Sequence, residues 1–315
     1  MSTRSSHITL PPPKKGPDRF FLALTATSGW LIVAVIAFIA VFLVATALPA
    51  LAKNEANFFT STMWQVGETL QFGIANLLWT TVISSVLAMA IAVPIAVGVA
   101  LLITQYVKGR IAGVVGFLVD LLAAVPSVIY GLWGAAVLAP AIDPVSKWMQ
   151  ANLGWIPLFA PGLQSSGTVF VASLVLAIMI LPIVTSISRD VFAQTPRDHI
   201  EAAWALGATK WEMISMAVIP YGRSGVVAAS MLGLGRALGE TIAVMLILST
   251  TNDLAINVSL FAGGETFASK IANNAAEFDS PTKTGAYIAA GMVLFVVTFV
   301  VNAAARTIVD RRKVK

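Results

Sequence analysis

Two oppositely charged side chains stand four residues apart inside a long apolar segment of this 315-residue chain. Arg236 and Glu240 fall within a glycine-rich stretch that runs from residue 233 to residue 241. In a helix, a spacing of four places both side chains on one face. A helix that began at Val226 would carry Arg236 roughly 15 Å into a bilayer, near its midplane. A charge there costs about 2.5 to 3.5 kcal/mol on insertion scales, so we expect Arg236 to face protein or water.

Two roles for this pair remain open from the sequence. In the first, Arg236 is a transient counter-ion for an anionic substrate, and Glu240 holds it when the path is empty. In the second, the two side chains form a buried salt bridge that only orients the helix. For Asp120, in an earlier apolar segment, a structural role or a place near the membrane surface is favoured over substrate contact. Gly235 and Gly239 form a G-x-x-x-G pair, which predicts close contact with another helix.

A charged, amphipathic insert from residue 190 to residue 213 separates two strongly apolar runs. It contains Glu201-Ala202-Ala203 and then Gly207, and Pro220 follows before the chain becomes apolar again. Gly207 is predicted to end one short helix before a second begins. The apolar residues expected to line one side of the insert are Ile200, Ala203, Trp204, Leu206 and Trp211. Because the charge of the insert is mixed rather than basic, a helix lying on lipid is the less favoured interpretation.

Other kinds of chemistry have little support in the sequence. The chain contains no G-x-x-x-x-G-K-[ST] phosphate-binding loop, so nucleotide binding is expected on another polypeptide. His7 and His199 have no neighbours typical of a metal site or of a nucleophile triad. Cysteine is absent, which excludes disulfides and thiolate metal sites.

The composition indicates an all-α integral membrane protein. Charged residues make up 11% of the chain, against about 25% in a typical soluble domain. Apolar stretches near 20 residues recur, whereas barrel strands would give alternating segments of about ten. We expect six transmembrane helices, at Ser28–Leu51, Phe72–Thr104, Gly113–Ala139, Thr168–Ser188, Val226–Thr250 and Thr284–Arg306. Pro94, Pro126 and Pro182 lie inside these spans and are expected to kink them.

Lysine and arginine predict the orientation, because cytoplasmic loops carry an excess of both. With the N-terminus inside, 15 of these residues fall in inner segments and 4 in outer ones, and Arg236 lies within a span. The net charge of +5 is largely this bias and is poor evidence for nucleic-acid binding. The predicted organisation is a disordered basic cytoplasmic tail at 1–19, a permease domain at 20–306 with a cytoplasmic loop at about 189–225, and a basic cytoplasmic tail at 307–315.

The insert resembles the EAA loop of bacterial ABC-importer permeases, whose short helix docks on a separate ATPase. Together with residues 125–131, 208–214, 220–223 and 236–241, it is similar to the PstC family of phosphate-importer permeases from about Thr69 onward. The family pattern prefers Ile and Leu where this chain has Ala217 and Ile219. The resemblance assigns ATPase coupling to Glu201, Ala202, Ala203, Gly207 and Pro220.

The same resemblance implies a type I importer fold and a non-enzymatic transport subunit of the bacterial plasma membrane. Its expected partners are a homologous PstA-like permease, two PstB-like ATPase subunits inside and a PstS-like phosphate-binding protein outside. No cofactor is expected in this chain, because ATP and Mg²⁺ would bind the partner ATPase.

Three alternatives stay open. A permease for another oxyanion, such as molybdate or sulfate, would share the EAA loop. A proton-coupled secondary transporter would use Asp120 or Glu240 as proton carrier, although no convincing inverted repeat favours it. A membrane scaffold without transport activity would leave the cost of placing Arg236 in the membrane unexplained.

Overall fold

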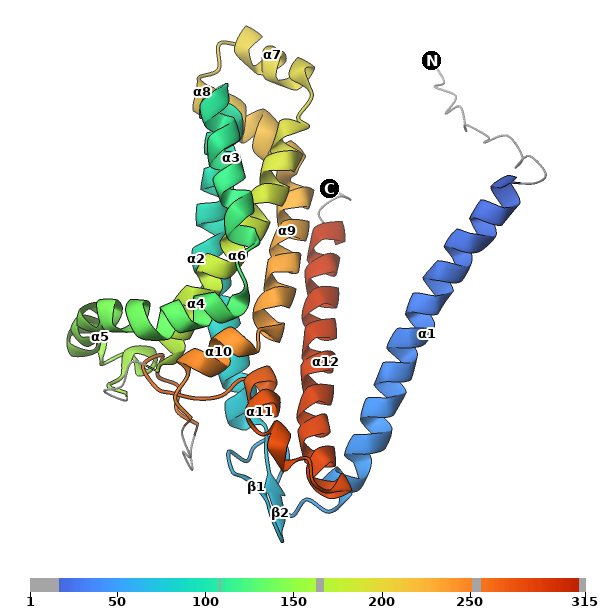
Figure 1. The fold of residues 1–315 in the computed structure, drawn as a ribbon. Helices are drawn as coiled ribbons and strands as arrows, with labels where there is room; N and C mark the ends of the chain where they lie inside the picture. Colours follow the sequence, from blue (N-terminus) through green and yellow to red (C-terminus); the bar gives the residue numbers. More distant parts are fainter. Residues whose placement is uncertain (1–16, 108, 163–166, 251–255, 312–315) are drawn as a thin grey trace. The chain divides into compact units, whose positions relative to one another are not determined.

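The computed structural model describes residues 17–107, 109–162, 167–250 and 256–311 (Figure 1). The chain falls into two compact units, one ending at Ala45 and one beginning at Thr46. In chain order the elements are α1 Pro17–Ala52, β1 Trp64–Val66, β2 Leu70–Phe72, α2 Ala75–Leu101, η1 Leu102–Tyr106, α3 Arg110–Ala123, α4 Ser127–Trp133, η2 Gly134–Leu138, α5 Ala139–Leu153, η3 Pro157–Phe159, α6 Val169–Ala193, α7 Arg197–Ala205, α8 Lys210–Met213, η4 Ile214–Val218, α9 Ile219–Gly239, α10 Ile242–Ile247, α11 Phe267–Asn273, η5 Ala275–Glu277 and α12 Pro281–Arg311.

Six helical stretches in this part of the chain are long and apolar enough to cross a membrane. They are Asp18–Ala52, Ala75–Tyr106, Ser127–Leu153, Val169–Ala193, Lys210–Gly239 and Pro281–Ala304. The prediction of an all-α protein with six spans is therefore confirmed. Helix α1 is apolar on every side and leaves large side chains such as Phe20 and Trp30 exposed, as suits a helix surrounded by lipid.

The first and last helices extend closer to the chain termini than the predicted first and sixth spans do. Helix α1 begins at Pro17, so residues 17–19 of the predicted tail are helical, while residues 1–16 lie outside the described residues. Helix α12 continues to Arg311, and residues 312–315 lie outside the described residues.

The predicted third span is wrong as a continuous helix. Helix α3 ends at Ala123, and a new helix starts at Ser127 with Pro126 in an extended conformation before it. Proline disfavours a helical conformation in the residue before it and has no N–H group to donate, so the break falls here. Helices α4 and α5, joined by η2, turn away from the direction of α3 (Figure 1). At about 1.5 Å per residue, the 14 residues of α3 extend only about 21 Å.

The predicted fifth span is wrong at both ends. The helix begins at Lys210 and continues through the π-helical turn η4 into α9, with Pro220 in the first turn of α9, where a missing N–H is tolerated. It ends at Gly239, because Glu240 has an extended backbone with ψ 128°. Helix α10 follows as a separate short helix.

The centre of the larger unit is built on small residues. Helices α2, α3, α6, α9 and α12 run alongside one another (Figure 1), and α6 contacts α2, α3 and α9. Ala88, Ala92 and Ala96 of α2 are fully buried, as is Ala229 of α9. Small side chains allow helix backbones to approach closely, which is how helices pack without a hydrophobic driving force in lipid.

Close glycine contacts occur at positions other than the predicted ones. A Cβ atom at Gly222 would lie 2.4 Å from the ring of Phe192, and one at Gly225 would lie 2.4 Å from Val191. These two glycines allow α9 to pack on α6. A Cβ atom at Gly235 or Gly239 would have no described atom within 4 Å, so the predicted G-x-x-x-G contact does not form within the described part of this chain.

A small hairpin closes the opposite end of the larger unit from α7 and α8 (Figure 1). Strands β1 and β2 pair antiparallel, with Trp64 opposite Phe72. Phe72 and Tyr287 of α12 are fully buried in one cluster together with Ala47 and Ala50 near the end of α1. Helix α11 begins at Phe267, whose side chain is fully buried.

Replacing Gly222 with leucine is expected to destabilise the fold, because the side chain would overlap the buried ring of Phe192. Overpacking of this kind costs typically about 1 to 3 kcal/mol. Gly235→Leu on the same helix is the control and is expected to leave stability unchanged. Thermal unfolding of the purified protein in detergent, followed by size-exclusion chromatography, measures the difference. Equal midpoints for the two variants would contradict the packing described here.

Candidate functional site

The segment between α6 and α9 forms a folded loop with a glycine at its turn. Helix α7 ends in a pair of hydrogen bonds in which Ala208 N donates to Ala203 O at 3.1 Å and Gly207 N donates to Trp204 O at 2.9 Å. This is the Schellman arrangement, and it requires a left-handed residue at Gly207, whose φ is +80°. The prediction that Gly207 ends the helix is confirmed, with a conformational reason. Side chains other than glycine adopt this φ only with strain.

The next helix begins with a reciprocal cap. Thr209 Oγ1 accepts from Glu212 N at 3.3 Å, while Thr209 N donates to a Glu212 carboxylate oxygen at 2.7 Å. This capping box satisfies backbone donors at the start of α8. The T-x-x-E spacing of Thr209 and Glu212 is the sequence signal for this cap.

The apolar side chains of this loop divide into two sets, contrary to the single face predicted from the sequence. Ala203 is buried and Ile200 is half-buried against a cluster built from Phe192, Met213, Ile214 and Val218. Trp204, Leu206 and Trp211 are instead 56%, 86% and 61% exposed. Glu201, Ala202 and Pro220 are also exposed. The loop is thus anchored on one side, and on the other it presents apolar surface of the kind that marks interaction sites.

Arg236 and Glu240 do not form the predicted salt bridge. Because the helix ends at Gly239, Glu240 leaves the face on which a continuous helix would place it. Its Oε1 accepts from Ala243 N at 3.3 Å at the start of α10. Arg236 is exposed and has no ion-pair partner among the described residues.

Arg236 belongs to an open face of α9. The exposed residues Ala228, Leu232, Arg236 and Gly239 are spaced by four, four and three, so they share one side of the helix. The adjacent side, about 100° around the helix, carries the buried residues Ala229, Gly233 and Ala237. A guanidinium group offers five donors in a planar fork that matches an oxyanion. This donor geometry is what an anion contact would need, and such a contact at Arg236 stays a prediction.

Asp120 is engaged in a separate ion pair. Its carboxylate lies 3.4 Å from Nη1 of Arg189, which also contacts Asp190 through Nε at 3.1 Å. Gly116, one turn earlier on α3, lies directly beneath the guanidinium, since a Cβ atom there would be 2.8 Å from Nη1. The pair links α3 to α6. Asp120 thus contacts Arg189 and not Arg236 among the described residues, and its role stays a prediction.

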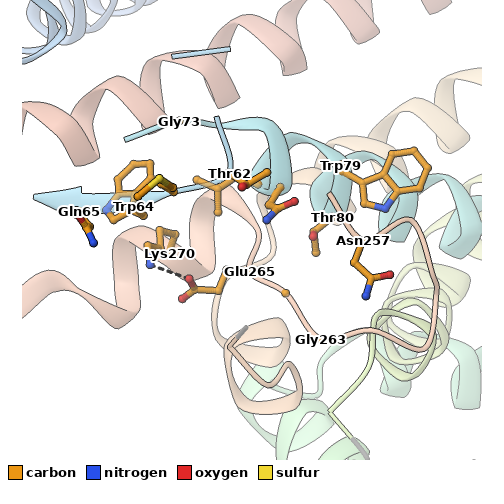
Figure 2. Close-up of a pocket in the computed structure, with 14 residues that line it drawn as sticks. Thr62, Trp64, Gln65, Gly73, Trp79, Thr80, Asn257, Gly263, Glu265 and Lys270 are labelled. Carbon is orange, nitrogen blue, oxygen red and sulfur yellow. Dashed lines mark hydrogen bonds and ion pairs between the residues drawn. The ribbon is translucent and has the colours of Figure 1, made fainter. Parts of the chain in front are cut away.

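A cavity that the sequence did not predict lies at the hairpin end (Figure 2). It is lined by residues of β1, the start of α2, and the segment from Asn257 to Lys270. Lys270 lies on α11 and is one of the four outer residues in the count of lysine and arginine. No motif connects this lysine with Asn76 and Thr80, so only the fold brings them together.

Comparisons with known proteins agree with this architecture. The sequence pattern of one family, described as "Binding-protein-dependent transport system inner membrane component", matches residues 92–314. A protein of Mycobacterium tuberculosis called "Phosphate transport system permease protein PstC 2" is 54% identical over 306 residues, which cover 96% of this chain and 94% of that protein. The "Phosphate transport system permease protein PstC" of Mycobacterium leprae is 55% identical, over 85% of this chain and 86% of that protein.

A solved structure supports the fold. The methionine ABC transporter MetNI in an inward-facing conformation contains a chain that matches with a TM-score of 0.54. The match covers 76% of this chain and 95% of the other, at 16% sequence identity. At that identity the likeness shows the shared permease fold alone.

Proposed function

We propose that this chain, which belongs to the PstC family of binding-protein-dependent membrane permeases, carries inorganic phosphate across the plasma membrane as part of an ATP-driven importer. The observation that carries the proposal is Arg236. It is a cation exposed on a membrane-length helix with no ion-pair partner among the described residues. The phosphate permeases named above supply the substrate class.

The geometry favours a substrate role for Arg236 over a structural salt bridge. Glu240 accepts a hydrogen bond from the backbone of α10 and forms no ion pair with Arg236 in the described part of the chain. Exposure of Arg236 to lipid would be costly, whereas exposure to a water-filled path would not. A phosphate ion that met this guanidinium would form charge-assisted hydrogen bonds, which are among the strongest available. We therefore assign Arg236 as a weak anion contact within the path.

The open face of α9 also bears on the assembly. Gly239 and the neighbouring Gly235 leave space for another backbone, and small-residue pairs of this type permit close helix contact. A homologous PstA-like permease would complete the path by facing this side of α9. A PstS-like binding protein would deliver phosphate at the hairpin end.

The α7–α8 loop is proposed as the contact with a PstB-like ATPase dimer that binds ATP and Mg²⁺. Its exposed residues Glu201, Ala202, Trp204 and Leu206 offer apolar surface with a charged border. Gly207 sets the turn, and Ala203 anchors the helix on the bundle. Pro220 lies at the start of α9, where the loop joins the span. The excess of lysine and arginine near this loop and near both termini supports a cytoplasmic position for all three.

The alternatives have less support. Permeases for molybdate or sulfate would share the fold, but the relatives at 54% and 55% identity are phosphate permeases. A proton carrier at Asp120 would have to release Arg189, and one at Glu240 would have to release the amide of Ala243.

The Arg236→Gln variant tests the anion path. It is expected to lower phosphate uptake into proteoliposomes to background, while the complex assembles and the external binding protein still binds phosphate. The double variant Arg236→Gln with Glu240→Gln is expected to stay inactive, because Glu240 is not the partner that Arg236 needs. Recovery of uptake in the double variant would show a structural pair instead. No uptake by the wild-type complex would remove the proposed function itself.

A second test addresses coupling. Glu201→Lys and Trp204→Ala are expected to release the ATPase or uncouple hydrolysis from uptake, because both side chains are exposed on the α7–α8 loop. The chain should still insert and fold, since neither side chain packs in the core. Trp155→Ala is the matched control, because Trp155 is 80% exposed in the loop after α5. Copurification of the ATPase and uptake per ATP hydrolysed are measured. Normal values for both loop variants would contradict the assignment.

A further inference from the structure

The cavity at the hairpin end of the bundle has a volume of about 260 Å³. A water molecule takes about 30 Å³ of liquid, so the space suffices for a small hydrated ion or an oxyanion of five heavy atoms. Figure 2 shows Thr80, Asn257 and Glu265 around this space, with Lys270 and Trp64 at one side. The segment that contains Gly264 can lie close to α2 because glycine has no side chain. A Cβ atom there would be 2.8 Å from Thr80 Oγ1.

A nearly buried ion pair forms one wall of the cavity. Lys270 Nζ lies 2.8 Å from Glu265 Oε2, and the side chains are only 15% and 12% exposed. Glu265 Oε1 accepts from Asn273 Nδ2 at 3.2 Å, and Lys270 Nζ lies 5.6 Å from the centre of the Trp64 ring. Removing both charges from water costs free energy, so a stabilising effect on the fold does not by itself account for such a pair. Because the pair lies in the wall of the cavity, its charged groups can also contact a bound ion.

The polar groups that line the cavity are rich in hydrogen-bond donors. An ammonium group has three donors, of which Glu265 takes one from Lys270. The amides of Asn76 and Asn257 and the hydroxyl of Thr80 add further donors. Glu265 is the one carboxylate among the residues that line this cavity, and an ionised carboxylate can only accept. One ammonium group and several neutral donors beside a single anionic acceptor fit an oxyanion that retains a proton.

We propose that this cavity is an acceptance site for hydrogen phosphate, where Lys270 donates to its oxygens and Glu265 accepts from its P–OH group. The assignment rests on the proposed function and extends it by naming the residues that receive the substrate at the hairpin end. It also predicts selectivity within the permease. Hydrogen phosphate keeps a P–OH group at neutral pH, whereas sulfate has no proton and would be repelled by Glu265.

Binding of inorganic phosphate to the purified complex tests the site directly. The assay uses ³¹P line broadening without ATP and without the external binding protein, in an Arg236→Gln background that removes the other anion contact. Broadening is expected in this background and should weaken at least about tenfold in apparent affinity when Lys270→Gln is added. The matched control is Lys147→Gln, which breaks an exposed pair with Asp143 and should change nothing.

A selectivity measurement isolates the role of Glu265. In the Arg236→Gln complex, which is the parent in this assay, sulfate is expected to compete poorly with phosphate. After Glu265→Gln is added, sulfate should compete at least about tenfold better, because the repelling charge is gone. The double variant Lys270→Gln with Glu265→Gln keeps the shape of the cavity and leaves no unpaired buried charge. It therefore replaces Lys270→Gln in the phosphate-binding assay if the single variant does not assemble.

Equal broadening in the parent, the Lys270→Gln complex and the double variant would overturn this site, as would the absence of broadening in the parent. Either result alongside phosphate uptake by the wild-type complex would leave the proposed function intact. Lack of uptake by the wild-type complex would instead remove the proposed function, whatever the binding assay shows.

Discussion

A guanidinium group in the last turn of an apolar, membrane-length helix is the constraint on which the proposed transport path depends. Hydrocarbon excludes it at a cost of about 2.5 to 3.5 kcal/mol on insertion scales, so it needs water, a partner or a ligand. Within the described residues Arg236 has no acidic partner, and the nearest candidate along the chain, Glu240, binds the backbone of α10. The helix break after Gly239 produces this separation. Arg236 is thereby left available on an open face of α9.

The same helix connects this cation to the far end of the molecule. From Lys210 to Gly239 the chain is helical over 30 residues, which at about 1.5 Å per residue is roughly 45 Å. Its first turn, capped by Thr209 and Glu212, belongs to the α7–α8 loop. Gly222 and Gly225 pack its middle against α6, and Arg236 lies near its end. A displacement of the loop would therefore reach Arg236 through one continuous helix.

Much of this organisation is readable from the sequence, because apolar runs near 20 residues and the position of Gly207 have direct physical meanings. Helix ends inside the membrane are less readable. The chain is apolar on both sides of Pro126 and of Gly239, so apolar content alone does not show that α3 and α9 end there. The spacing of Arg236 and Glu240 predicted a pair only if the helix continued. The hairpin-end cavity had no local signal, since its residues come from segments nearly 200 positions apart.

Thiol labelling along α9 tests the central claim most directly, because the chain has no native cysteine. Leu232→Cys and Gly239→Cys place thiols on the same face as Arg236, and Phe299→Cys places one on α12, where Phe299 is 69% exposed. In the assembled complex, a water-soluble thiol reagent is expected to modify the two α9 positions and to leave residue 299 unmodified in lipid. Modification at 299 with none at 232 and 239 would show that the face of Arg236 does not line a water-filled path.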